Sequence, residues 1–541
     1  MSTVKQVAQL AAVIGRVFTL ELLAAVASHS ARELGEALEK LVAAEVLYRA
    51  DRPPQVVYEF KHALLQDVAY QSLLKSSRQQ YHLRLARVLE ERFPTIVQVQ
   101  PELVAHHYTE AGQAQAAITH WLAAARRATQ RSANLEAIAQ LRRGLALLDA
   151  LPDMAERRRQ EHQLRLTMIA PLIAAKGYAS AEIEETCGQV VRLSEEIGDV
   201  SAIFPALSGR HASESVTGQI DRARRHAEEL MRLAKRYPHS DGEAFAGRIL
   251  GSATLLNGDS TSGRVLLEET LGKYDADRDR SSAFVYGHDH FATCASYLCL
   301  ALWHQGEIAR AEEYKERAIA HARSLSHMNT LCLALAFTGG YFPGLCRDGE
   351  AVARVAAEIL ALASEHKLPL WSAAGTVLMG HALAEQDRDR DGVAHMQAGL
   401  AGLQAINIRI FSPLFLAWQA AAQLRCGQIR EGMAAIDEAF EIGKGGEHWM
   451  DAELHRLRGE LILASSADSP EKAEESLRAA LGVAQAQRSK TLELRAAIGL
   501  ARFYGTYAAG REVLAPVLDW FGDDPDMRDV TEARLLLQSL S

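Results

Sequence analysis

One spacing recurs along most of this 541-residue chain and restricts what it can fold into. A turn residue, usually glycine, is followed five positions later by a small residue, and often by another seven positions further on, as at Gly306, Ala311 and Ala318. Small side chains at such steps allow the two helices of a pair to approach closely. Gly349 and Gly392 also resemble turn residues but lack the small residue that should follow. The spacing joins Gly112 to Ala117, Gly218 to Ala223, Gly258 to Gly263, Gly306 to Ala311, Gly427 to Gly432, Asp468 to Ala473 and Gly510 to Ala515.

The distance between successive turns gives the kind of repeat. From Gly218 to Gly510 the turns lie about 42 residues apart on average, within the range of helical solenoids. The pattern resembles a tetratricopeptide repeat that exceeds that family's usual length of about 34 residues. A generic HEAT-like array is the alternative, and the register of small residues favours the tetratricopeptide interpretation. We therefore predict an all-α fold in which residues 95–541 form a tetratricopeptide-like solenoid.

Residues 1–94 have a different pattern. The segments QVAQLAAVIG, TLELLAAVAS and SARELGEALEKLVAAEVL have helical apolar spacing, and Ser30 is placed to cap the third. The turn DRPPQ then separates two β-prone pieces, VLYRA and VVYEF. Three helices followed by a two-stranded ribbon is the order of a winged helix. We predict a winged-helix-like domain over residues 1–94, with one long exit helix that begins after His62 and stops at Pro94.

Charge and hydropathy exclude some classes of protein. The net charge of −9 argues against a dedicated nucleic-acid binder, which needs a basic surface to displace counterions. No apolar run reaches the roughly 18–20 residues that span a bilayer, and the start of the chain lacks a convincing signal-cleavage site. We expect a cytoplasmic protein without membrane contact. No CxxC pair is present, so we expect the six cysteines to be buried apolar residues.

Motifs that carry chemistry are missing from the sequence. The Gly-Lys pairs at 272–273 and 443–444 lack the glycine that a phosphate loop has five residues earlier. His288, Asp289 and His290, with Cys294 and Cys299 after them, are the best metal candidates, but Asp289 also suits the N-cap of the next helix. We expect capping there, and helix packing for the pair at 106–107. The sequence thus predicts no enzyme, no metal and no cofactor of its own.

Longer segments resemble one bacterial family. They are AAVIGRVFTLELLAAV, YEFKHALLQDVAYQSLLKSSRQQYHLRLARVLEERF and PELVAHHYTEAG, and later YGHD, LRGELIL, LELRAAIGLARFY and EVLAPVLDWF. The family is that of multidomain signal-transduction ATPases, often fused to a class III adenylate or guanylate cyclase. The resemblance extends from about residue 8 to the end. The cyclase and NTPase portions are absent from this chain, and His290 stands where the family pattern has proline.

The resemblance implies a regulatory and sensory half, in which the winged helix restrains an NTPase and the solenoid receives a signal. The leading hypothesis is a non-enzymatic interaction module that binds a protein or peptide on its concave face, with an NTPase or cyclase partner in trans. A winged-helix transcriptional regulator is one alternative. Its third helix, however, carries more glutamates (Glu33, Glu36, Glu39 and Glu45) than cations (Arg32 and Lys40), which disfavours DNA. The other alternative is a truncated cyclase or ATPase that is active only with a partner. The sequence leaves open whether the chain is a split subunit, a truncated gene product or a fragment with a mis-called start.

His62 is the one candidate binding residue. FKHALLQDVAY resembles the motif at the winged-helix end of nucleotide-switch ATPases, where a histidine reaches the phosphates of bound ADP. Phe60, Lys61, His62 and Leu64 fit the motif, but Ala63 replaces its acidic residue. The alternative is that His62 caps or packs the corner between strand and helix. Our hypothesis is that it is at least partly exposed, on the face that would meet an NTPase domain.

Overall fold

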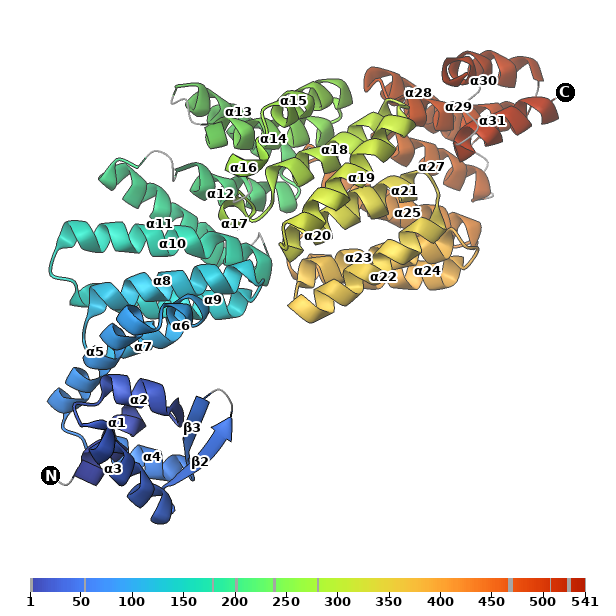
Figure 1. Ribbon diagram of the computed structural model, residues 1–541. Helices are drawn as coiled ribbons and strands as arrows, with labels where there is room; N and C mark the ends of the chain where they lie inside the picture. The colour runs from blue at the N-terminus through green and yellow to red at the C-terminus, as the bar shows by residue number, and fades with distance from the viewer. Residues whose placement is uncertain are drawn as a thin grey trace. The chain divides into compact units, whose positions relative to one another are not determined.

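The computed structural model describes residues 3–52, 55–177, 180–199, 203–236, 240–279, 282–465, 470–505, 507–522 and 527–540. They form two compact units, residues 1–128 with 136–167, and residues 129–135 with 168–541. The sequence predicted a boundary at residue 94 between a winged-helix-like domain and a solenoid. That boundary separates two types of domain rather than two compact units, and it stays a prediction. The fold is all-α apart from one small sheet, as predicted (Figure 1).

The first unit begins with three helices and a three-stranded antiparallel sheet. The elements are α1 (Thr3–Ile14), β1 (Val17–Thr19), α2 (Leu20–Val26), α3 (Ala31–Ala43), β2 (Leu47–Arg52) and β3 (Gln55–Phe60). β3 lies between the other two strands, so that Phe18 pairs with Tyr58 and Leu47 pairs with Phe60. The sequence indicated β2 and β3 but missed β1, because three residues between two helices are too few to show an alternating pattern. The predicted cap is confirmed: Ser30 and Glu33 form a capping box on α3.

The single long exit helix predicted after His62 is wrong. The chain forms α4 (Ala63–Gln71), α5 (Lys75–Arg92) and α6 (Pro94–Val99), with a break at residues 72–74. Leu74 has extended backbone, and Leu73 turns into the core with 7% of its surface exposed. The break lets α4 pack on α1 while α5 packs on α7 (Pro101–Glu110). Tertiary burial of Leu73 therefore overrides the helical periodicity.

The rest of the first unit is helical. α8 (Ala114–Gln130), α9 (Asn134–Leu145), a short 3-10 turn (Leu148–Ala150) and the first part of α10 (Met154–Lys176) follow α7. The hydrophobic core is continuous from Val7 in α1 to Ala124 in α8. Gly112 has a φ of 72°, and Ala117, five residues later, is fully buried. The predicted register of turn and small residue is present here.

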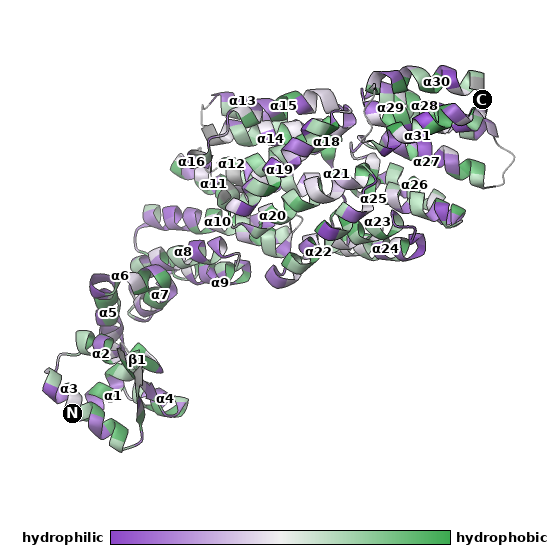
Figure 2. Ribbon diagram, turned by 45° about the vertical axis from the view of Figure 1, so that its right-hand side comes forward, coloured by the Kyte–Doolittle hydropathy of each residue, from purple (hydrophilic) through white to green (hydrophobic). Residues whose placement is uncertain are grey.

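The second unit consists of helices that pack on their neighbours in the chain (Figures 1 and 2). Figure 2 shows hydrophobic and hydrophilic residues on the same helices, as amphipathic packing requires. One π-helix, η3 (Leu335–Tyr341), interrupts the array, and Gly339 and Gly340 bring it close to Val355 and Leu378. The helices are α11 (Ala181–Ile197), α12 (Ile203–Val216), α13 (Ile220–Arg236), α14 (Ser240–Leu256), α15 (Ser260–Gly272), α16 (Ala276–Asp279), α17 (Ser282–Tyr286), α18 (His290–His304), α19 (Ile308–Ser324), α20 (Met328–Ala334), α21 (Phe342–Leu345), α22 (Gly349–His366), α23 (Pro369–Ala384), α24 (Asp389–Ala405), α25 (Ser412–Arg425), α26 (Ile429–Gly443), α27 (Asp451–Ala464), α28 (Pro470–Ala486), α29 (Lys490–Tyr504), α30 (Tyr507–Phe521) and α31 (Arg528–Ser539).

The small residues of the repeat lie at helix crossings. Ala311 and Ala318 of α19 and Ala473 of α28 are fully buried, in agreement with the predicted register. Two of the predicted turn glycines, Gly392 and Gly510, lie inside α24 and α30, and a third, Gly349, is the first residue of α22, directly after the turn. A Cβ on Gly392 would come within 2.6 Å of the Gly380 carbonyl oxygen, so this glycine serves close packing of α23 on α24. Asp468 lies outside the described residues.

Contacts between distant turns supplement this local stacking. The carbonyl of Val216, at the end of α12, accepts hydrogen bonds from the backbone N–H groups of Arg409 and Ile410, at 2.6 and 3.0 Å. The carbonyl of Leu256, at the end of α14, accepts from His448 and Trp449 at 2.8 and 3.1 Å. The ends of early helices are thus tied to the segments that precede α25 and α27. The array is not held by nearest neighbours alone.

Candidate functional site

His62, the residue predicted from the sequence, is exposed. It occupies the N-cap position of α4 with extended backbone, and its side chain makes no capping hydrogen bond. Leu64 and Val68, on the outer face of the same helix, are 74% and 68% exposed. The nucleotide-sensing role of His62 stays a prediction, and the surface around it is apolar.

The other histidine motifs are structural. Asp289 accepts a hydrogen bond from the backbone N–H of Ala292 at 2.8 Å, so the predicted N-cap of α18 is confirmed. His321 lies 3.0 Å from a carboxylate oxygen of Asp289. Cys294 and Cys299 are buried, whereas Cys346 and Cys426 are only partly so. Among the described residues there is no cluster of metal-ligating side chains, and none of their helices is long and apolar enough to cross a membrane.

The pair at 106–107 belongs to a histidine cluster in the first unit. His107 and His82 face each other with their Nδ1 atoms 2.9 Å apart, and Tyr70 Oη lies 3.0 Å from His82 Nε2. Burial lowers the pKa of His107 to about 3 and that of His82 to about 4. Both rings are therefore neutral near pH 7 and pack α5 on α7. The packing role expected for the pair is therefore confirmed for His107, whereas His106 is exposed and its ring only borders those of the other two histidines.

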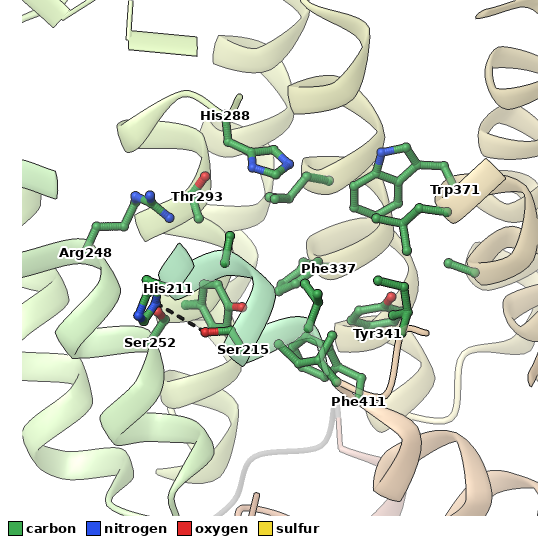
Figure 3. A pocket seen from close by; sticks show the side chains of 18 of the residues that line it. His211, Ser215, Arg248, Ser252, His288, Thr293, Phe337, Tyr341, Trp371 and Phe411 are labelled. Atoms are coloured by element: carbon green, nitrogen blue, oxygen red, sulfur yellow. Dashed lines mark hydrogen bonds between the residues drawn. The ribbon is translucent and has the colours of Figure 1, made fainter. Parts of the chain in front are cut away.

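The second unit contains a cavity of about 120 Å³ that the sequence did not reveal (Figure 3). Side chains from α12, α14, α18, η3, α23 and the start of α25 line it. The hydrogen bonds from Arg409 and Ile410 to Val216 lie at its edge and join α12 to the segment before α25. We call it the aromatic cavity, because one of its walls consists of aromatic rings.

The opposite wall is polar and carries one formal charge. Figure 3 shows Arg248 extending from α14 towards Thr293, with His211, Ser215 and Ser252 on the same side. His211 Nδ1 lies 3.1 Å from the Ala223 carbonyl, and its Nε2 lies 3.2 Å from Ser215 Oγ. The carbonyl can only accept, so Nδ1 carries the proton and Nε2 accepts from the serine hydroxyl. Burial, together with the charge of Arg248, lowers the pKa of His211 to about 3.

Among the described residues, Arg248 has no carboxylate at hydrogen-bond or ion-pair distance, and Asp289 acts on it only over a longer range. Within the described chain it forms no hydrogen bond and no ion pair, and its buried Nε lacks an acceptor. Its guanidinium lies 5.1 Å from the ring centre of Phe245, a cation–π contact that uses none of its N–H donors. None of the described residues that line the aromatic cavity is an aspartate or a glutamate. Burial lowers the pKa of Arg248, and the more distant Asp289 offsets this effect only in part.

The aromatic wall depends on two local irregularities of the backbone. The π-helix places Phe337 and Tyr341 on one side, each about 5 Å from the ring of Phe411 (4.9 and 5.2 Å between centroids). Phe411 has a φ of 63°, a conformation that costs energy for a residue other than glycine. Its backbone N–H donates to the carboxyl group of buried Glu447, with its two oxygens at 3.0 and 3.2 Å. Glu447 therefore holds Phe411 in this conformation, and burial raises the pKa of Glu447 to about 8.

A second cavity, of about 230 Å³, lies among the later helices of the same unit. Its arginines are paired. Arg495 contacts Asp529 at 2.7 Å and Glu453 at 3.6 Å. We call this set the arginine network; it comprises Arg347, Arg425, Arg456, Arg495 and Arg502 with Glu385, Glu453, Glu460, Asp529 and Glu532.

No protein-family model matches the chain. An uncharacterized protein of Rhizobium meliloti (strain 1021) is 26% identical over 508 residues, which cover 92% of this chain and 48% of that protein. The chain thus spans about half the length of the curated relative that it matches.

Among solved structures, the chain is similar to a Signal Transduction ATPase with Numerous Domains that has a tetratricopeptide repeat sensor, from Pyrococcus horikoshii. The identity is 11% and the TM-score 0.30, over 99% of this chain and 63% of that one, which is less than two thirds of its length. The apo quorum sensor NprR of B. thuringiensis is 14% identical with a TM-score of 0.40, over 72% of this chain and 100% of that one. A Rap protein complexed with Competence and Sporulation Factor is 11% identical with a TM-score of 0.32, over 78% and 97%. At these TM-scores the similarities carry no argument about function.

Sequence reasoning missed the aromatic cavity for a clear reason. Its lining residues come from segments that start at Ser208 and end at Phe415, and each segment looks like an ordinary apolar helix. The glycine pair in LAFTGGY was the one local sign of an irregular helix there. Arg248 has no local sign of its role, because its lack of a partner depends on the whole fold.

Proposed function

We propose that this chain is a non-enzymatic sensory module, in which the aromatic cavity binds an effector and the first unit transmits the bound state to an NTPase domain. The observation that carries the proposal is the aromatic cavity itself: a polar wall with one unpaired cation faces a wall of aromatic rings. Such concave sites, mostly apolar with a few convergent polar groups, are typical of ligand binding.

The groups in the aromatic cavity favour binding over catalysis. Ser215 and His211 form the only nucleophile-like pair among the described lining residues. A histidine with a pKa of about 3 is a poor general base near pH 7, and its Nδ1 faces a backbone carbonyl rather than a carboxylate. The pair is therefore suited to fixing α12, not to activating a serine.

The first unit offers a docking surface for the NTPase domain. Helix, strand, two helices and two strands is the order of a winged helix, and we assign residues 1–94 to that class as part of the proposal. Exposed His62, Leu64 and Val68 would face the NTPase, whether it lies on the same polypeptide or is supplied in trans.

DNA binding fits the first unit less well. Exposed side chains on α3 include Glu33, Glu36 and Glu39, against Arg32 and Lys40. Arg32 is also paired with Glu36 at 2.9 Å. A recognition helix needs free cations for phosphates and base edges, so α3 is unsuited to the major groove.

The proposal is tested by ATP turnover. The P-loop NTPase that this proposal requires, sought first among the genes beside this one, is assayed alone, with the chain, and with a His62→Ala chain. We expect the wild-type chain to change the turnover and His62→Ala to weaken that effect, whereas Glu91→Ala, an exposed change on α5, keeps it. Turnover that ignores the chain, or steady turnover by the purified chain alone, would contradict the proposal.

A further inference from the structure

We propose that the ligand of the aromatic cavity is a small carboxylate with an apolar or aromatic body, and that Arg248 binds its carboxylate group. This inference rests on the proposed function, which makes the aromatic cavity the effector site. It adds the chemical class of the effector and the residue that selects it.

Arg248 has unused hydrogen-bond donors that suit a carboxylate. A guanidinium has five N–H donors in a fork that matches a carboxylate, and none of them is used within the described chain. The nearby Asp289 is engaged with the N-terminus of α18 and with His321. Arg248 is partly exposed, but its Nε is buried and has no acceptor. An anion in the cavity would therefore satisfy donors that water reaches only in part.

The charge of the site favours a monoanion. His211 and His288 both have a pKa lowered to about 3 by burial, so Arg248 is the only described lining residue that is charged near pH 7. Glu447, behind Phe411, is held largely neutral by burial, which raises its pKa to about 8. One positive charge neutralises a carboxylate, whereas a phosphate dianion would carry a second, uncompensated charge into an apolar site.

The aromatic wall, across the cavity from Arg248, determines which kind of body the carboxylate ligand can have. Phe337, Tyr341 and Phe411 lie across the cavity from Arg248 (Figure 3), and Trp371 directs its N–H to Asn329 at 2.6 Å and so offers an apolar face. A cavity of about 120 Å³ holds a small molecule. The hydrogen bonds of Arg409 and Ile410 to Val216 join the helices at its edge, so an extended peptide fits less well.

Binding to the full chain is measured by titration calorimetry and by the shift in melting temperature. The probes are 3-phenylpropanoate and hexanoate, the neutral 3-phenylpropanamide, and inorganic phosphate. We expect at least one carboxylate to bind, with the amide and phosphate about 10–100-fold weaker, the range of one charge-assisted contact. Arg248→Met should lose the preference for carboxylate, whereas Arg354→Met, an exposed change on α22, should keep it.

A second variant guards against loss of folding in Arg248→Met. Ser252 lies one helical turn after Arg248 on α14, so Ser252→Asp places an internal carboxylate beside the guanidinium. We expect this variant to fold and to lose carboxylate binding. The proposal is overturned if the amide binds as well as the acid, if Ser252→Asp and Arg248→Met bind the acid like wild type, or if neither carboxylate binds. Carboxylate binding without any effect on the NTPase would leave this inference standing and remove the proposed function.

Discussion

The aromatic cavity and the arginine network lie in the same helical array, yet they treat buried charge in opposite ways. In the network Arg495 contacts two carboxylates, whereas Arg248 in the aromatic cavity contacts none. The pKa values of two buried glutamates, Glu453 in the arginine network and Glu447 beside the aromatic cavity, differ in the same way. Burial alone would raise the pKa of Glu453, but Arg456 and Arg495 hold it near 2, whereas burial raises that of Glu447 to about 8. The ion pairs of the arginine network hold helices to one another, whereas a guanidinium without an ion pair leaves a site at which an anionic ligand can bind.

The largest expected effect is in the arginine network. Arg495→Met removes the 2.7 Å partner of buried Asp529, which keeps only Arg347 at 3.7 Å, and it removes one of the two arginines beside Glu453. The largely uncompensated charge of Asp529 should lower the free energy of unfolding by about 3 kcal/mol. Arg502→Met, which removes a half-exposed pair with Glu532, should cost at most about 1 kcal/mol. Denaturant unfolding of both variants measures the difference. Equal small losses would show that the network does not stabilise the fold.

The next effect is a pH dependence that comes from Glu447. Its folded-state pKa is raised to about 8, so between about pH 4.5 and 8 the folded chain keeps a proton that the unfolded chain has released. Stability should therefore fall as the pH rises through this window, by at most about 1.4 kcal/mol per pH unit. Glu447→Gln should remove this contribution, and Glu350→Gln, an exposed change, should not. A difference between wild type and Glu447→Gln that stays constant with pH would refute the assignment.

A smaller effect is expected for the unpaired arginine. Without ligand, Arg248→Met should stay within about 1 kcal/mol of wild type or become more stable, because it removes a cation–π contact and an uncompensated charge together. Thermal and denaturant unfolding without added carboxylate measure this. A loss as large as that of Arg495→Met would end the contrast between the two regions.

The smallest effect is expected at His62. Its side chain is exposed and makes no capping bond, so His62→Ala should change the free energy of unfolding by no more than about 0.5 kcal/mol. The same denaturant experiment gives the value. A loss of several kcal/mol would establish a packing role and remove the sensor hypothesis.

Much of the fold was predictable from local patterns. The buried positions of Ala117, Ala311 and Ala473 followed from the spacing after each turn, and the capping box at Ser30 followed from the residue types. The failures share a cause. The break at residues 72–74 and the in-helix position of Gly392 both come from contacts with distant segments, which periodicity does not record.

The candidate site was less predictable than the fold. His62 was found through a motif, because its neighbours in sequence carry the resemblance. Arg248 and Phe411 were not found, since the aromatic cavity forms only when segments that begin at Ser208 and end at Phe415 meet. Glu447 was not found because its role is a hydrogen bond to Phe411, 36 residues earlier in the chain.

The sequence by itself therefore determined the all-α class, the pairing of neighbouring helices and the caps, because these depend on residues within a few turns of each other. The tertiary structure alone decided which arginines are paired. Whether a guanidinium is compensated depends on acids that the chain brings near it from any distance, and the strength of that interaction depends on burial. The aromatic cavity has the same origin, since hydrogen bonds join the end of α12 to the segment before α25 at its edge.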